Sequence, residues 1–314
     1  MRSRSDWLRI FRRWRACGHH LRRRALRCRG RATLLRLTAA TLVTAFFLFP
    51  VYWLFMISFK TADEIYAFPP VWWPASLQFG NYLVLFKDGD ASAVWNSLVI
   101  ASVSTLLAML LGTMSAYSLA RFRTGGDDLS NWIISQRMVP PIAVVFPVFL
   151  LYAFLGWVDT YVGMILLYTA FNLPYVIWMM RGYIQDIPLS LEEAALIDGC
   201  TRWQVIWKVV LPMCRAGLFA TAIFTFVFAW NEFLFALVLT RTEVVTYTVQ
   251  VTHYFGGQSN FWTKIAAMSV LGTLPVFIAV IFMQRYLVRG ISLGAVKDRK
   301  STRLNSSHTD ISRM

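Results

Sequence analysis

The chain has 314 residues, of which 57% are hydrophobic and only 15% are charged. This excess of apolar residues is typical of a membrane protein and argues against a soluble globular domain. A net charge of +15 is a feature of many nucleic-acid-binding proteins. Many of the arginines here, however, lie in residues 1–36, before and within the start of the first hydrophobic run. A basic flank on a membrane span indicates a cytoplasmic anchor, so we expect no nucleic-acid partner.

The first segment is this basic arm, residues 1–33, which we expect to be disordered or to lie on the cytoplasmic membrane surface. An interfacial amphipathic helix is one form it could take, and a non-native or misassigned start is an equal alternative. The cysteines are Cys17, Cys28, Cys200 and Cys214. They form no CxxC pair, and we expect neither a disulfide nor a metal site.

Hydrophobic segments long enough to cross a bilayer recur six times after the arm. We expect spans at Leu34–Ile57, Val94–Leu119, Trp132–Leu155, Tyr161–Met180, Ala216–Leu239 and Ile265–Val288. Prolines in the third predict a kink or a break. The sequence thus predicts an all-α membrane protein with a six-span domain over residues 34–297. We interpret the polar tail, residues 298–314, as appended or misassembled sequence.

Lysine and arginine in the connecting segments set the expected orientation. With the N-terminus inside, the inner segments hold the arm, Arg121, Arg123, Arg181, Arg202, Lys208, Arg215, Arg285, Arg289 and Lys297. The outer segments hold only Lys60, Lys87, Arg241 and Lys264. We therefore expect a multi-pass protein of the cell (inner) membrane with both termini in the cytoplasm.

A polar island, residues 190–212, separates the fourth and fifth spans. Ser190 with Glu193, and Thr201 with Gln204, are capping-box patterns, so we expect two short helices, the first over Leu191–Asp198. Gly199 lies where a left-handed residue ends the first helix. The second carries an apolar stripe at helical spacing and is bounded by Pro212. The stripe comprises Trp203, Ile206, Trp207 and Val210.

The same island resembles the EAA signature of the permease subunits of ABC importers. The residues that carry the resemblance are Glu193, Ala194, Ala195, Gly199, Val209, Leu211 and Pro212. In that family the stretch is the coupling helix, which seats in a groove of the ATPase subunit. The alternative is an ordinary capped loop between two spans. The resemblance implies that ATPase coupling depends on Glu193, Ala194, Ala195, Asp198, Gly199, Leu211 and Pro212.

The resemblance extends over residues 34–297 and is most similar to carbohydrate-uptake permeases, of the second-permease type in maltose-like importers. Its further segments are Asn96–Leu98, Ala116–Arg121, Trp230–Asn231 and Gly294–Lys297. It implies a MetI-like type I importer fold and import of a sugar or polyol. The implied partners are a second homologous permease, two ATP-binding ABC subunits and an extracytoplasmic solute-binding protein.

Glu232 is an acid well inside a predicted span. Ionisable groups within a membrane are costly and are candidates for function. With Trp230 and Asn231 it would form a polar, aromatic lining for a hydroxyl-rich solute, which makes all three candidate translocation-pathway residues. The alternative is a structural hydrogen bond to another helix or a position near the outer surface. Gln136, Asn172 and Gln284 are weaker candidates, expected to make helix-packing contacts.

Enzyme signatures are missing from the sequence: it contains no GxxxxGK[ST] phosphate loop, and its histidines do not cluster. We therefore expect a non-catalytic subunit with no cofactor of its own, and ATP bound by partner subunits. Two alternatives stay open, a related permease for a non-carbohydrate solute and an ion-coupled secondary transporter. The second class typically shows internal repeats, and no repeat is evident in this sequence.

Overall fold

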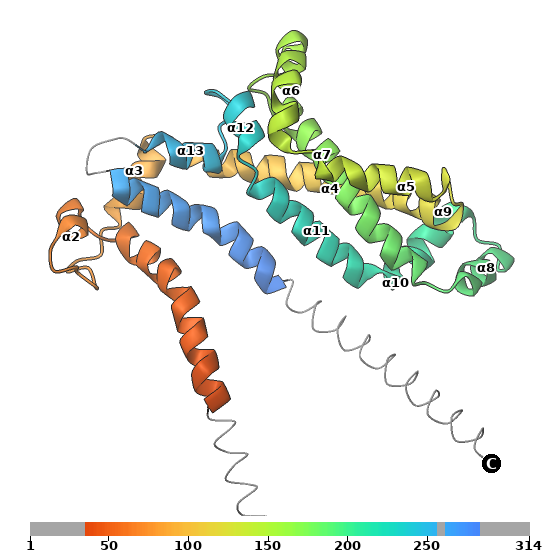
Figure 1. The fold of residues 1–314 in the computed structure, drawn as a ribbon, viewed down its shortest axis with the longest axis horizontal. Helices are drawn as coiled ribbons and strands as arrows, with labels where there is room; N and C mark the ends of the chain where they lie inside the picture. Colours follow the sequence, from red (N-terminus) through yellow and green to blue (C-terminus); the bar gives the residue numbers. More distant parts are fainter. Residues whose placement is uncertain (1–34, 256–260, 283–314) are drawn as a thin grey trace, which may run out of the picture. The chain divides into compact units, whose positions relative to one another are not determined.

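The computed structural model describes residues 35–255 and 261–282 (Figure 1). The predicted arm, the polar tail and the end of the sixth span lie outside these residues. The chain divides after Ile57 into two units. All regular secondary structure in the described residues is helical, which agrees with the all-α prediction.

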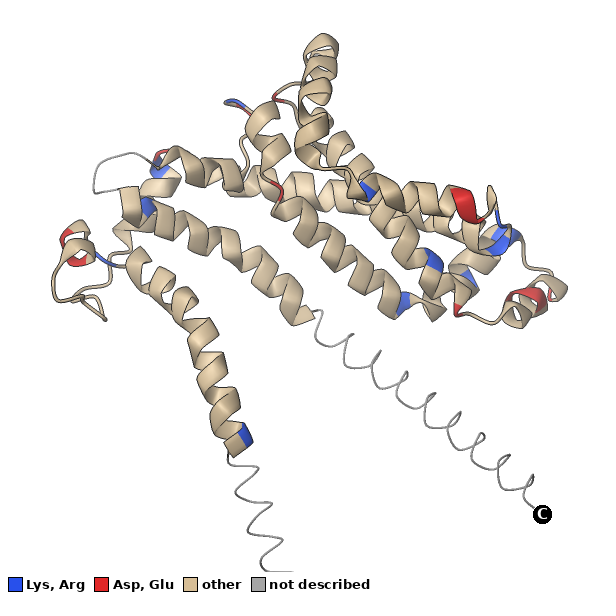
Figure 2. Ribbon diagram, in the orientation of Figure 1, with Lys and Arg blue, Asp and Glu red and all other residues tan. Residues whose placement is uncertain are grey.

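In the described part of the chain, four helices are long and apolar enough to cross a membrane: Leu35–Ser58, α4 (Ser92–Arg121), α7 (Tyr161–Gln185) and Phe261–Phe282. Two bent helix pairs raise the number to as many as six, if each pair is one span. The middles of the long helices carry almost no charged residues (Figure 2). Such helices satisfy their own backbone hydrogen bonds, as a bilayer requires.

The third predicted span is broken at its prolines. α5 (Gly126–Ser135) and a 3-10 turn (Gln136–Met138) meet α6 (Pro141–Leu155) at 90°. Val139 and Pro140 are extended, because the helical region is disfavoured for a residue before proline. Pro141 then occupies the first position of α6, where its missing N–H costs nothing.

The fifth predicted span, Ala216–Leu239, is also broken, which we did not expect. α11 (Arg215–Trp230) ends before Asn231, and α12 (Leu234–Leu239) begins three residues later. No glycine or proline lies at this break. Side chains instead bind the freed backbone groups: Thr248 Oγ1 donates to the Glu232 carbonyl at 3.0 Å, and the Glu232 carboxylate accepts from amides of α12.

The centre of the second unit is the packing of α4 against α7, with α11 against both. Small residues allow this close approach, as in other membrane helix pairs. A Cβ added at Gly112 of α4 would come within 2.6 Å of Val176 Cγ1 on α7. One buried cluster joins these helices to α6, α12 and α13 (Tyr247–His253). Two short helices, α2 (Ala62–Tyr66) and α3 (Gly80–Lys87), precede α4.

Asp159 connects the loop before α7 to the segment after α12. Its carboxylate accepts hydrogen bonds from the backbone N–H groups of four successive residues, at 3.0 to 3.1 Å, from Arg241, Thr242, Glu243 and Val244. Burial alone would raise the pKa of Asp159, but these four donors outweigh it and lower the pKa to about 2. The ionised carboxylate therefore stabilises this pair of loops.

Replacing Asp159 by Asn should destabilise the protein by roughly 1–3 kcal/mol, because an amide turns two hydrogens toward N–H donors. A lowered pKa contributes stability that is complete above the ordinary value of 3.8 and is lost as pH falls through about 2. The loss in Tm, measured in detergent, should thus be constant between about pH 5 and pH 8. Asp128→Asn, at an exposed position, is the control. A loss that varies over this range would contradict the assignment.

Candidate functional site

The predicted coupling region forms a continuous segment, residues 189–213, which we call the coupling segment. α8 (Leu189–Ile197) begins directly after Pro188, so Ser190 lies inside the helix and its predicted capping box is wrong. Gly199 is left-handed, with φ +85°, as predicted. Cys200 N donates to Ala195 O and Gly199 N to Leu196 O, both at 3.0 Å. These two bonds form a Schellman motif, which satisfies the last carbonyls of α8.

The second half of the coupling segment contains three short elements rather than one helix. They are α9 (Arg202–Val205), a π-helix (Ile206–Val210) and α10 (Leu211–Met213), and together these three elements meet α11 at 80°. The predicted capping box of Thr201 and Gln204 is present. Of the predicted apolar stripe, Trp203, Ile206 and Trp207 line one pocket with Leu106 and Leu110 of α4. Val210 is buried, as is Val205 five residues before it, while Trp203 and Trp207 are exposed. The wider π turn shifts the buried face.

α8 has two distinct faces. Ala195 and Leu196 pack against the buried cluster formed by α4, α7 and the coupling segment. Glu193, Ala194 and Ile197 are exposed, Ile197 to 86%. Of the other predicted coupling residues, Asp198, Gly199 and Pro212 are exposed and Leu211 is half-buried. The exposed face of α8 is therefore available to a partner protein.

Glu192, which precedes the EAA match, was not among the predicted coupling residues. Its side chain is 1% exposed and forms an ion pair with Arg121 of α4 at 2.6 Å. Tyr117 donates its hydroxyl hydrogen to the other carboxylate oxygen at 2.9 Å. Helical spacing could have indicated its position, because Glu192 lies three and four residues before the half-buried Ala195 and Leu196 and so shares their face of the helix.

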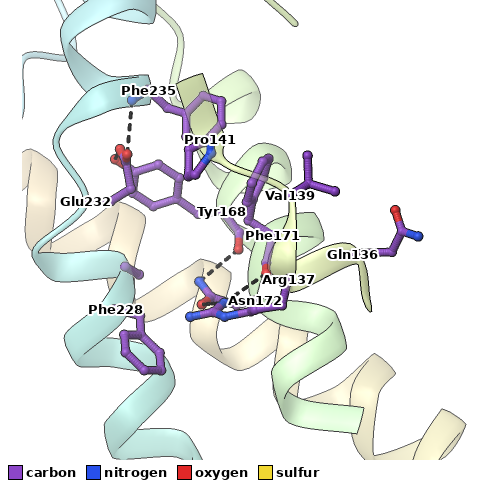
Figure 3. Close-up of a pocket in the computed structure, with 11 residues that line it drawn as sticks. Gln136, Arg137, Val139, Pro141, Tyr168, Phe171, Asn172, Phe228, Glu232 and Phe235 are labelled. Carbon is purple, nitrogen blue, oxygen red and sulfur yellow. Dashed lines mark hydrogen bonds between the residues drawn. The ribbon is translucent and has the colours of Figure 1, made fainter. Parts of the chain in front are cut away.

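Glu232 lines a cavity of about 230 Å³ between the broken spans (Figure 3). Its carboxylate accepts from Phe235 N at 3.0 Å, Ala236 N at 3.2 Å and the Tyr168 hydroxyl at 2.8 Å. The acid thus binds the first amides of α12, and it also makes the hydrogen bond to another helix that was the alternative prediction. The side chain also lines the cavity, and its pathway role stays a prediction.

The side chain of an arginine that was not among the predicted residues also lines the cavity. Arg137 donates to Phe171 O at 3.1 Å and to Asn172 Oδ1 at 3.4 Å, and its guanidinium lies over the Phe228 ring at 4.6 Å. Gln136 and Asn172, predicted as weaker candidates, line the cavity too (Figure 3). The cavity therefore combines aromatic faces with charged and amide groups from α7 and from the broken third and fifth spans.

The other two predicted pathway residues lie outside the cavity lining. Trp230 is 1% exposed, donates to Gly272 O at 3.0 Å and stacks on Tyr247 at 4.8 Å. Asn231 is exposed, but its amide donates to Val227 O of its own helix. Trp230 thus stabilises the packing of α11 against the last described helix. Within the described residues, no group of three His, Cys, Asp or Glu side chains could hold a metal ion.

Residues 108–293 match the model of a protein family described as the binding-protein-dependent transport system inner membrane component. This match covers more than half of the chain and includes both the coupling segment and the cavity. The chain belongs to this family.

Relatives of this permease agree with the family match. The trehalose transport system permease protein SugB of Mycobacterium tuberculosis is 37% identical over 263 residues, covering 82% of this chain and 95% of that protein. The trehalose/maltose transport system permease protein MalG of Thermococcus litoralis is 32% identical over 270 residues, covering 84% and 96%.

A solved structure shares the fold of this permease. A chain of a bacterial ABC transporter that imports the acidic polysaccharide alginate superimposes with a TM-score of 0.68, at 23% identity, covering 91% of this chain and 99% of that one. The predicted fold, that of an ABC importer permease, is confirmed.

The chain is therefore a multi-pass inner-membrane permease of a binding-protein-dependent ABC importer, which works with a periplasmic binding protein and ATPase subunits. It is a non-catalytic subunit that binds no cofactor, and its ATPase partners handle ATP. The predictions of function class and of a non-enzymatic role are confirmed.

Proposed function

We propose that this permease imports a sugar or polyol, together with a second homologous permease and two ATP-binding subunits. Its relatives are named for trehalose and for trehalose/maltose transport. The cavity supports the proposal, because aromatic faces and a few convergent polar groups suit a hydroxyl-rich solute. Glu232 and Asn231 are the proposed pathway groups, and Trp230 supports them from the buried side. A related permease for a non-carbohydrate solute remains the second candidate.

The observation that carries the coupling role is the exposed face of α8. Glu193 is exposed and makes no hydrogen bond within the described part of the chain, so its carboxylate is free to bind an arginine of a partner. Ala194 beside it is small enough to permit close approach. We propose that this face seats in a groove of an ATPase subunit, with Asp198, Gly199, Leu211 and Pro212 setting its shape.

The proposed orientation follows from the positions of lysine and arginine in the connecting segments. With six spans and a cytoplasmic coupling segment between the fourth and the fifth, both termini lie on the cytoplasmic side of the inner membrane. The proposed domain organisation keeps residues 34–297 as the permease domain, residues 1–33 as a basic cytoplasmic arm and residues 298–314 as a polar tail. The excess of basic residues is then an anchor, and no nucleic acid is a partner.

A photo-crosslinking amino acid placed at Ile197 tests both the docking face and its orientation. In the assembled transporter, irradiation should join this position to an ATPase subunit, identified by mass spectrometry. The control is Phe68, which is 96% exposed and lies in a segment expected on the outer face. An adduct between the ATPase and position 68, or none at position 197, would refute the proposal.

A further inference from the structure

The strongest unassigned feature is a junction of three helix ends at Arg121, the last residue of α4. Its guanidinium Nε donates to Glu192 Oε1 of α8 at 2.6 Å. Its Nη2 donates to the carbonyls of Ile184, at 2.8 Å, and Ile187, at 2.9 Å, at the end of α7. Arg121 therefore binds α4, α7 and α8 at once.

Both charges of this junction are almost fully buried. The Arg121 and Glu192 side chains are 9% and 1% exposed, and each carboxylate oxygen has a donor from α4, because Tyr117 binds the second. Removing one partner of such a pair leaves a buried charge unpaired. Arginine suits the position because its planar fork donates from separate nitrogens in fixed directions, whereas a lysine presents its three donors from a single nitrogen.

We propose that Arg121 is a positioning residue for energy coupling, which fixes α8 to α4 and α7 so that displacement of α8 moves both spans. The inference rests on the proposed seating of α8 in an ATPase subunit. Glu192 is buried and its neighbour Glu193 is exposed, so one acid holds the helix to the membrane domain while the other faces the partner.

The contacts of α4 and α7 at their other ends determine which regions such a displacement would affect. The same helix whose last carbonyls bind Arg121 carries Tyr168, whose hydroxyl donates to Glu232 in the cavity. α4 carries at its other end Asn96, whose amide donates to Val245 O and which accepts from Tyr161 of α7. Movement of α4 and α7 together therefore reaches the cavity and the segment that follows α12.

The test measures solute taken up per ATP hydrolysed by the complete transporter in proteoliposomes. Glu192→Gln keeps the shape and an acceptor for Tyr117, and Arg121→Lys keeps the charge. Both should lower uptake per ATP by roughly 2- to 30-fold, the range of mutations that modulate coupling, while the crosslink from Ile197 to the ATPase persists. The matched control is Asp127→Asn, which breaks the ion pair of Arg181 and Asp127, where Asp127 is 88% exposed; it should leave the ratio unchanged.

A second measurement separates positioning from a merely structural role. In a chain without other cysteines, spin labels at Ile197 and at the exposed Leu111 of α4 report the distance between the two helices. The distribution of this distance should be narrow in the parent chain and broad in the Glu192→Gln variant. An unchanged ratio and distribution with an intact crosslink, or failure of both variants to assemble, would overturn the inference. Loss of the crosslink in the parent chain would instead refute the proposed docking.

Discussion

Replacing Gly199 by Val should reduce ATP-driven uptake by at least about tenfold, although the subunit still inserts and assembles. Gly199 has φ +85°, and no atom lies within 4 Å of a Cβ added there. Space is therefore available, and the penalty comes from the backbone alone, which is severe for a β-branched residue. Relieving that strain breaks the two hydrogen bonds that end α8 and turns α9 away from its present direction.

Gly199→Asn is the matched control, because Asn tolerates the left-handed region better than other residues with a side chain. It should retain most of the uptake, which separates backbone strain from the mere presence of a side chain. The measurement is uptake and stimulated ATP hydrolysis in proteoliposomes, with binding-protein docking measured alongside. Normal transport by Gly199→Val would show that the shape of the coupling segment is unimportant, and the coupling proposal would lose its main support.

Replacing Glu232 by Ala should produce the second large loss of uptake. The change leaves two amides of α12 and the Tyr168 hydroxyl without their acceptor, and each unsatisfied donor costs roughly 1–3 kcal/mol. The break between α11 and α12 then loses the carboxylate that binds the first amides of α12, and the cavity changes shape. Uptake should fall strongly while the complex still assembles and keeps its basal ATP hydrolysis.

Two further variants divide the roles of Glu232. Tyr168→Phe removes one donor and keeps the ring, so its loss should be smaller than that of Glu232→Ala. Glu232→Gln keeps an oxygen for α12 but removes the charge, and uptake close to that of the parent would assign the carboxylate to capping alone. Unchanged uptake in Glu232→Ala would contradict the pathway role altogether.

The continuous spans were predictable from the sequence, because α4 and α7 depend only on long apolar runs. The break at Pro140 and Pro141 was also predictable, since proline acts on its own chain. The break at Asn231 was not, because it depends on partners that are distant in sequence, Tyr168 and Thr248.

The candidate site shows the same division. The turn at Gly199 and the cap at Thr201 are local and were found from the sequence. Ser190 was misassigned because Pro188, two residues earlier, sets the start of α8. Helical spacing places Glu192 near Ala195 and Leu196, but its partner Arg121 lies 71 residues away, and the tertiary contact alone shows that this acid forms a buried ion pair.

The length of α4 decides the surroundings of the ion pair at its end. Its 30 residues span about 45 Å, whereas the hydrocarbon layer of a bilayer is about 30 Å thick. A steep tilt could take up part of the excess, and the remainder of the helix lies among lipid headgroups or beyond them. If the middle of α4 lies at the middle of the bilayer, Arg121 and Glu192 meet where water and headgroups, rather than acyl chains, surround the protein. An ionised pair is far less costly there than at the bilayer centre.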